Sequence, residues 1–174
     1  MYIMNSPIKK YVTEYNRKKA VEYAHRWALG RNPKFYDFSD LGGDCTNFTS
    51  QVIYTGSGIM NYTPDTGWYY INLNNRAPAW TGVDFLYSFL TKNTTKGPFA
   101  EEVDVKDVQP GDIVQLSFEK ANDFNHSPVI INTGTIPDES NIQIAAHSID
   151  RDYYPLTNYD WEYIRFIHIK GVYK

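Results

Sequence analysis

The hydrophobic periodicity of the chain changes once, near Val108, and this change constrains the fold more than any other feature. Before Val108 the apolar residues follow helical spacing, and after it they alternate with a period of two. Helices are expected over residues 13–29, 45–57 and about 82–92, and strands over 111–118, 127–133, 141–148 and 163–173. Because consecutive strands joined by short turns form antiparallel sheets, the sequence predicts an α+β fold rather than an alternating α/β fold.

Each expected helix carries start or stop signals of its own. Thr13 is the candidate N-cap of the first helix, and Gly30 terminates that helix. Asp44 is expected to cap the second helix and Thr81 the third. The segment 56–78, rich in Gly, Asn and Tyr, has few periodic signals and is predicted to be a long loop of functional importance or high flexibility.

Length and charge limit the functional classes. The 174 residues are expected to form one domain, 1–174, with a core of its own. A net charge of −3 gives no electrostatic reason to expect nucleic acid as a partner. No stretch is long and apolar enough for a membrane span, and residues 1–7 lack the features of a signal peptide, so we expect neither. The oligomeric state stays open.

The only cysteine of the chain, Cys45, lies in the segment GGDCTNF at residues 42–48. A single cysteine cannot form an internal disulfide, and it is too few for a cysteine-type metal site. It is therefore either a small buried apolar side chain or a nucleophile. On the first turn of a helix a thiol experiences the positive end of the helix dipole, which favours the thiolate. This position favours the nucleophile, with the preceding Asp44 as a further candidate site residue.

A cysteine nucleophile needs a base, and His126, at the start of an apolar strand, is the best candidate. Side by side, the two would form a thiolate–imidazolium pair for acyl transfer. A hairpin symmetric about the turn at 134–139 would place His147 opposite His126 as its orienting group. A register slip of one residue would put Ser148 there instead, and Asp150 becomes a candidate only if the strand ends before it.

The sequence separations between candidate ligands do not favour a metal site. His25 and His168 have no ligand cluster nearby in the sequence and are interpreted as structural. Cys45, His126 and His147 are residue types that suit zinc, but no two of them have the close spacing of zinc motifs. We therefore expect no metal.

Four segments taken together resemble the bacterial putative amidase domain, which belongs with the NlpC/P60 and CHAP peptidases in the papain-like group. They are DCTNFTSQ at 44–51, PGDIV at 110–114, HSPVI at 126–130 and AHSID at 146–150. The pair Trp68-Tyr69 and the segment PAWT at 78–81 extend the resemblance. It implies a papain-like fold, with the nucleophile on an early helix and the base and orienter on consecutive strands of the following sheet.

The resemblance also implies hydrolysis of an amide bond in peptidoglycan or its peptide stems, without metal or cofactor. Cys45 would be the nucleophile, His126 the general base and His147 the third polar residue. CHAP-type domains usually carry an acidic residue followed by Asn at that third position, which leaves Asp150 as the alternative. Relatives of the NlpC/P60 type place a tyrosine upstream of the cysteine in the oxyanion site, and Tyr36 is the candidate here. The backbone N–H of Cys45 would be another donor.

The aromatic residues Trp68, Tyr69 and Trp80 are candidates for the wall of the substrate cleft, with packing against the sheet as the alternative, favoured for Trp80. The resemblance implies a cell-envelope or secreted location. Three other interpretations stay open: a cysteine acyltransferase of the same fold, a non-catalytic cell-wall-binding module, and a structural protein with an inert thiol. Amine acceptors in a turnover assay would test the first, and thiol reactivity would test the other two.

Overall fold

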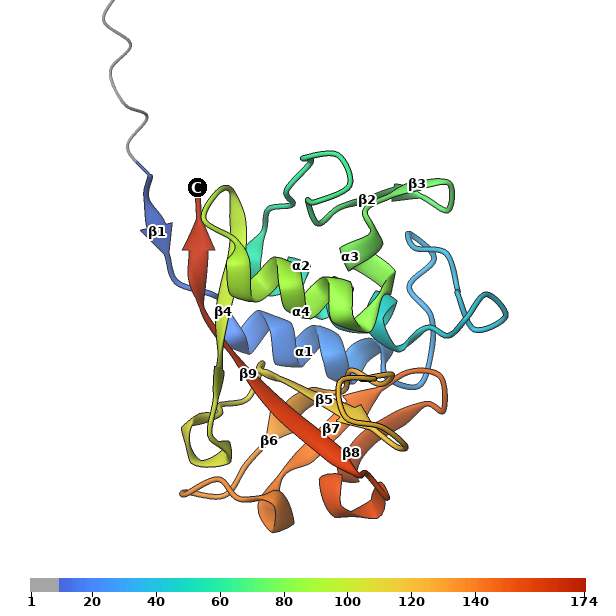
Figure 1. Ribbon diagram of the computed structural model, residues 1–174, viewed down its shortest axis with the longest axis vertical. Helices are drawn as coiled ribbons and strands as arrows, with labels where there is room; N and C mark the ends of the chain where they lie inside the picture. The colour runs from blue at the N-terminus through green and yellow to red at the C-terminus, as the bar shows by residue number, and fades with distance from the viewer. Residues whose placement is uncertain (1–9) are drawn as a thin grey trace, which may run out of the picture.

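A computed structural model describes residues 10–174, so the expectation about a signal peptide at 1–7 lies outside the described residues. The helices gather in one half of the molecule and strands β5 to β8 form the other half (Figure 1). The helices are α1 (Arg17–Trp27), α2 (Cys45–Ser57), α3 (Pro78–Thr81) and α4 (Val83–Lys92). Among the described residues, no helix has the length and apolar character needed to cross a membrane.

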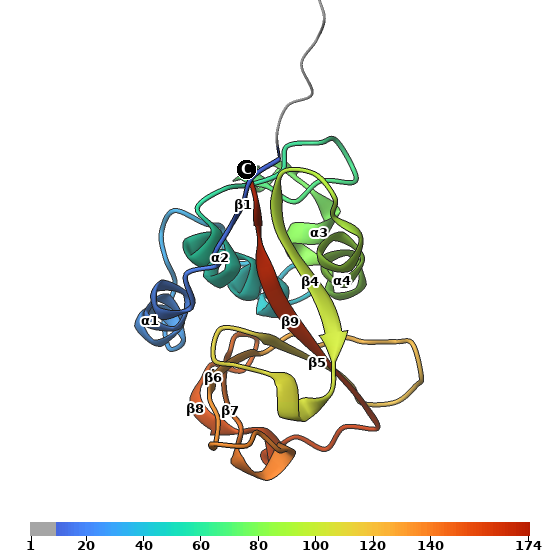
Figure 2. The same ribbon diagram turned by 90° about the vertical axis from the view of Figure 1, so that its left-hand side faces the viewer.

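The seven strands of the main sheet are all antiparallel to their neighbours. They are β1 (Val12–Thr13), β4 (Gly97–Val103), β5 (Ile113–Ser117), β6 (Val129–Asn132), β7 (Gln143–Ala146), β8 (Arg151–Pro155) and β9 (Tyr163–Tyr173). Their order is β1-β9-β5-β6-β7-β8, and β4 also pairs with β9. A separate hairpin joins β2 (Tyr70–Asn72) and β3 (Asn75–Arg76). The structure is therefore α+β with an antiparallel sheet, and β9 runs from the helical half into the half built by β5 to β8 (Figure 2).

Local sequence signals predicted the bounds of α2 correctly but not the N-caps of α1 and α4. Helix α2 covers the residues expected for it. The first helix begins later than predicted, because Thr13 pairs with Val172 in the sheet and Asn16 takes over as N-cap by accepting a hydrogen bond from the Lys19 backbone. Gly82, not Thr81, is the N-cap of α4, because Thr81 still belongs to the short α3. The long segment 56–78 is not structureless, since it contains the β2–β3 hairpin.

Two apolar clusters lie on opposite faces of the sheet. Neighbouring residues of one strand point to opposite faces, so Val129 of β6 packs with the helices while Ile130 packs in the second cluster. In β7, Ala145 belongs to the helical cluster, and Ile144 and Ala146 belong to the other. This alternation decides on which side of the sheet each histidine of the candidate site lies.

Asp112, from the PGDIV segment, ties α1 to the sheet. Its carboxylate is fully buried and forms an ion pair with Arg17 (2.7 Å). The same carboxylate lies 2.7 Å from His168 Nδ1 and accepts hydrogen bonds from the backbone N–H groups of Gln109 (2.8 Å) and Ile169 (2.9 Å). His168 is therefore structural, as expected, and the motif holds β5, β9 and α1 together rather than contributing to a reaction.

Candidate active site

Cys45 is the first residue of α2, and a glycine turn delivers the chain to this position. Gly42 (φ 88°) and Gly43 (φ 107°) both adopt left-handed conformations that favour glycine. A Cβ on Gly43 would lie 3.3 Å from the Ser148 hydroxyl, which also accepts a hydrogen bond from the Asp44 backbone. The turn therefore packs against the chain just after β7 and places the thiol at the start of the helix with only 8% of the residue exposed.

His126 lies just before β6, in a bridge with Leu116, and is 9% exposed. Its Nε2 is 3.1 Å from the hydroxyl of Tyr159, and its ring also faces Phe118. The backbone of Ser127, the residue after His126, lies near enough to the Cys45 thiol to act toward a lower pKa of that thiol. The structure thus brings the nucleophile candidate to the strand end that carries the base candidate, although within residues 10–174 no hydrogen bond joins the two side chains.

Burial sets the charge state of this pair. Loss of solvent raises the pKa of the Cys45 thiol, and this effect outweighs the hydrogen bonds from Thr46 and Ser127 that act in the other direction. The same loss of solvent lowers the pKa of His126 to about 4. Burial therefore favours the neutral thiol and the neutral imidazole at rest, against the expected thiolate–imidazolium pair.

His147 does not lie opposite His126, which overturns the predicted symmetric hairpin. Strand β6 pairs with β7 as Val129↔Ala145 and Ile130↔Ile144, and continuing this register places Ser148 opposite His126. The turn is asymmetric because it contains a short 3-10 helix, Glu139–Asn141, and the register shifts again beyond Ile130. Since the register differs by one residue from the symmetric expectation, the His147 side chain points to the helical face of the sheet.

On that face His147 is held by Asp44 and by the end of α1. Its Nδ1 lies 2.6 Å from Asp44 Oδ2, its Nε2 lies 2.8 Å from the Trp27 carbonyl oxygen, and its ring stacks on Phe48 at 4.0 Å. Asp44 occupies the N-cap position of α2 but forms no side-chain capping hydrogen bond. The predicted N-cap residue is therefore confirmed, but the Asp44 carboxylate turns toward His147 instead of capping the first-turn N–H groups.

Two other predicted site residues are engaged elsewhere. Asp150 binds Arg31 through both carboxylate oxygens, at 2.9 and 3.0 Å. The Tyr36 side chain is 40% exposed and packs edge-on against Phe38, while its carbonyl accepts a hydrogen bond from the Asn47 side chain near the start of α2. Neither Asp150 nor Tyr36 contacts His126 in the hydrogen-bond network of residues 10–174, and an oxyanion role for Tyr36 stays a prediction.

The two tryptophans expected in the cleft wall belong to the core. Trp68 and Trp80 are fully buried, with ring centroids 5.0 Å apart. Each indole N–H donates to a side chain of α2: Trp68 to Ser50 (3.0 Å) and Trp80 to Asn47 (2.9 Å). The prediction that Trp68 lines a substrate cleft is wrong, and the packing alternative favoured for Trp80 is confirmed, because both rings use their large apolar area in the core. Tyr69 is partly exposed, and its role in the wall of the substrate cleft stays a prediction.

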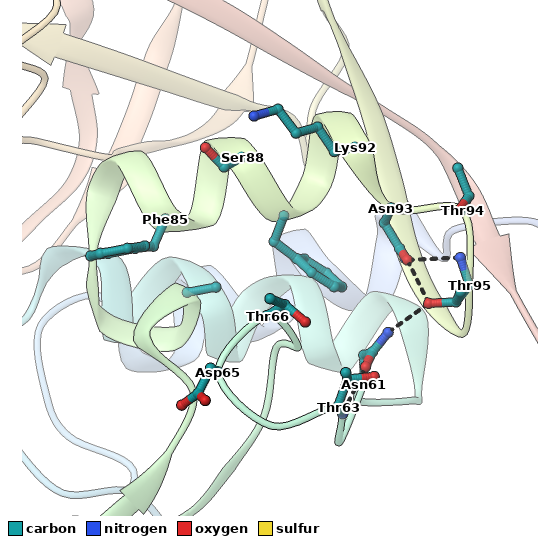
Figure 3. Close-up of a pocket in the computed structure, with 12 residues that line it drawn as sticks. Asn61, Thr63, Asp65, Thr66, Phe85, Ser88, Lys92, Asn93, Thr94 and Thr95 are labelled. Carbon is teal, nitrogen blue, oxygen red and sulfur yellow. Dashed lines mark hydrogen bonds between the residues drawn. The ribbon is translucent and has the colours of Figure 1, made fainter.

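A cavity of about 490 Å³ lies at the other end of α2 (Figure 3). It is lined by the 61–66 loop, by α4 residues such as Phe85 and Ser88, and by the 93–95 turn. Cys45 begins α2, whereas Asn61 follows its C-terminal end, and thirteen residues span roughly 18 Å of helix. This cavity is therefore not the space around the thiol. Within residues 10–174, no group of three or more His, Cys, Asp or Glu side chains could hold a metal ion.

Sequence reasoning missed Tyr159, which follows the 3-10 helix Leu156–Asn158 and hydrogen-bonds to His126. No motif or spacing singles it out among the fifteen tyrosines of the chain. A signal was absent because the contact joins residues 33 positions apart and depends on the path of the loop between β8 and β9.

A lone cysteine at a helix N-terminus, brought to a histidine-bearing strand end of an antiparallel sheet, is an arrangement that suits acyl-transfer chemistry on an α+β scaffold. The chain belongs to the putative amidase domain family, whose sequence profile matches residues 14–169. It is also 31% identical over 129 residues to uncharacterized protein YhbB of Bacillus subtilis (strain 168). That match covers 71% of this chain and 40% of the relative, so the chain spans less than half of that protein's length. No solved structure matches the chain.

Proposed function

We propose that the chain is a cysteine-dependent amide hydrolase in which Cys45 attacks the amide carbonyl and His126 is the general base. Membership of the putative amidase domain family supports hydrolysis of amides. The observation that carries the cysteine mechanism is the position of Cys45 on the first turn of α2, where the backbone of Ser127, the residue after His126, acts on the thiol to lower its pKa. The papain-like character of the fold is part of the proposal and is supported by the order of elements, with the helix of Cys45 before the antiparallel sheet.

The reaction starts from the neutral pair. As the sulfur attacks the carbonyl carbon, the thiol proton passes to the free ring nitrogen of His126, and the amide oxygen becomes the oxyanion. Backbone N–H groups at the start of α2, which has no side-chain cap, can donate to that oxyanion. The His126 imidazolium then protonates the leaving amine, which gives a thioester. Water deprotonated by His126 hydrolyses the thioester and restores the thiol.

We extend the proposal to the amide bonds of peptidoglycan or its peptide stems, the substrate class that the sequence resemblance to NlpC/P60 and CHAP domains implies. An envelope or secreted location would follow from such a substrate. The match to a longer bacterial protein is compatible with a catalytic unit that works beside other segments.

The test is amine release from purified peptidoglycan and from soluble stem peptides, followed by mass spectrometry of the products. Cys45→Ala should abolish turnover, and His126→Ala should reduce it about 10²- to 10⁴-fold. His25→Ala is the matched control, because His25 pairs with Asp152 and has no contact with the candidate site among the described side chains; it should keep full activity.

Turnover that survives Cys45→Ala would overturn the cysteine mechanism. If an acceptor amine is supplied and all products carry that amine, the acyltransferase would be favoured instead. Unchanged binding of peptidoglycan by the wild type and by Cys45→Ala, with no turnover in either, would favour the non-catalytic module.

A further inference from the structure

We infer that Tyr159 is the positioning residue that orients the His126 imidazole, and that His147 holds the Asp44 carboxylate instead. The inference rests on the proposed function only in treating His126 as the general base. The sequence resemblance implied that His147 orients His126. In the structure Tyr159 contacts His126 instead, and His147 contacts Asp44.

The ring nitrogens of His147 are both occupied. Nε2 lies 2.8 Å from the carbonyl oxygen of Trp27, and a carbonyl oxygen only accepts hydrogen bonds, so Nε2 carries a proton. Nδ1 lies 2.6 Å from Asp44 Oδ2. With Phe48 stacked on its face and 1% of the residue exposed, His147 has no remaining polar atom with which to contact His126.

The Asp44 carboxylate is surrounded by hydrogen-bond donors and by Arg31. Its Oδ1 accepts from the Phe38 backbone (2.9 Å) and the Asn47 amide (2.8 Å), and Arg31 Nε lies 3.3 Å from Oδ2. Both ring nitrogens of His147 therefore have partners, on Asp44 and on the Trp27 carbonyl, and neither is free to contact His126.

Holding Asp44 in this way keeps the start of α2 open. An aspartate at an N-cap position ordinarily turns its carboxylate onto the first-turn N–H groups of the helix. Here the carboxylate faces His147, and no side chain caps α2. A negative charge on those N–H groups would compete with the oxyanion, so the Asp44–His147 pair supports the site without touching the reacting atoms.

Tyr159 reaches His126 from the opposite side of the sheet. The loop that carries it is anchored by the hydrogen bond from the Tyr159 backbone to the Leu156 carbonyl (3.1 Å). Its ring meets the edges of His126 at 5.2 Å and of Tyr154 at 5.3 Å, and Phe118 closes the group at 6.3 Å. Tyr159 Oη is 3.1 Å from His126 Nε2, so this nitrogen has a fixed partner and Nδ1 is left for the thiol proton.

For His126 to accept a proton at Nδ1, its Nε2 must carry the hydrogen and donate it to Tyr159 Oη. Tyr154, Arg151 and Cys45 lie near enough to Tyr159 to affect its pKa. Burial lowers the pKa of His126, which favours the neutral ring at rest.

The first experiment is ¹⁵N NMR of the histidine rings in the wild-type protein between pH 6 and pH 8. We expect His126 as the Nε2–H tautomer and His147 with a proton on the Nε2 that faces the Trp27 carbonyl. A His126 ring with its proton on Nδ1, or a His147 ring without a proton on Nε2, would overturn the inference. Because this readout needs no substrate, it decides the point even if no amide hydrolysis is found.

The second experiment compares Tyr159→Phe with Tyr154→Phe, which removes a hydroxyl from the same aromatic group but has no hydrogen bond to His126 among the described contacts. Tyr159→Phe should convert His126 to a mixture of tautomers and lower kcat about five- to tenfold at unchanged KM, as expected for one lost hydrogen bond. Tyr154→Phe should change neither. A His126 ring that is unaffected by Tyr159→Phe but altered by His147→Asn would overturn the inference.

Discussion

Replacing Asp44 by asparagine tests the ion pair on which the geometry around Cys45 depends. The carboxylate is fully buried, lies 2.6 Å from the His147 ring and 3.3 Å from Arg31, and accepts two further hydrogen bonds. Asparagine has the same shape but no charge. Its terminal NH₂ group is a donor and would face the N–H donors that now surround the Asp44 carboxylate. The substitution therefore removes the electrostatic and hydrogen-bonding partner of His147 without creating a cavity.

The expected loss in the free energy of unfolding is about 3 kcal/mol. Removing one partner of a buried ion pair costs roughly 3–5 kcal/mol. The lower end applies because asparagine keeps one acceptor oxygen at this position, which leaves mainly the cost of lost charge-assisted hydrogen bonds. At the unfolding entropy usual for a chain of 174 residues, this corresponds to a decrease in Tm of about 8 °C.

The assay is urea unfolding at pH 7, followed by tryptophan fluorescence, since Trp68 and Trp80 are fully buried. Asp150→Asn is the matched control, because Asp150 pairs with the same Arg31 but its side chain is 33% exposed. An exposed pair contributes at most about 1 kcal/mol, so the control should lose little. A loss below about 1 kcal/mol for Asp44→Asn, or equal losses for both variants, would refute the assignment of Asp44 and His147 as a buried ion pair.

Three further predictions follow from burial and packing. Between pH 6.5 and about 4 the unfolded chain binds a proton on His126 and the folded chain does not. The free energy of unfolding should therefore fall by about 2–3 kcal/mol as the pH decreases through this window, and His126→Gln should lack this part of the pH dependence in urea unfolding. Burial raises the pKa of Cys45, so alkylation at pH 8 should be slower in the folded protein than in urea, and a faster folded-state rate would contradict the neutral resting pair. Gly67→Ala should destabilise the protein by about 1–3 kcal/mol, because a Cβ there would clash with the backbone oxygens of Asn61 and Thr63. Gly30→Ala is the control: a Cβ at Gly30 would meet no atom within 4 Å, so the urea midpoint should change little.

The features that local signals specify were predictable. Helix α2 begins at Cys45 because Gly42 and Gly43 supply the left-handed turn before it, and it ends at Gly58 for the same conformational reason. The period-two alternation after Val108 predicted antiparallel strands close to β5, β6, β7 and β9. Strands β1, β4 and β8 were not predicted, because they are held by pairing with β9 or β7 rather than by their own pattern.

The partners of the site histidines depended on tertiary structure alone. One residue of register between β6 and β7, set by an asymmetric turn, moved His147 to the helical face of the sheet. There it met Asp44, which is 103 positions away in the chain, while His126 met Tyr159 from a loop beyond β8. The sequence by itself determined where the thiol and its helix lie, since those depend on neighbouring residues. Only the packed sheet decided which side chain touches which histidine, because side chains alternate between faces and a shift of one residue exchanges them.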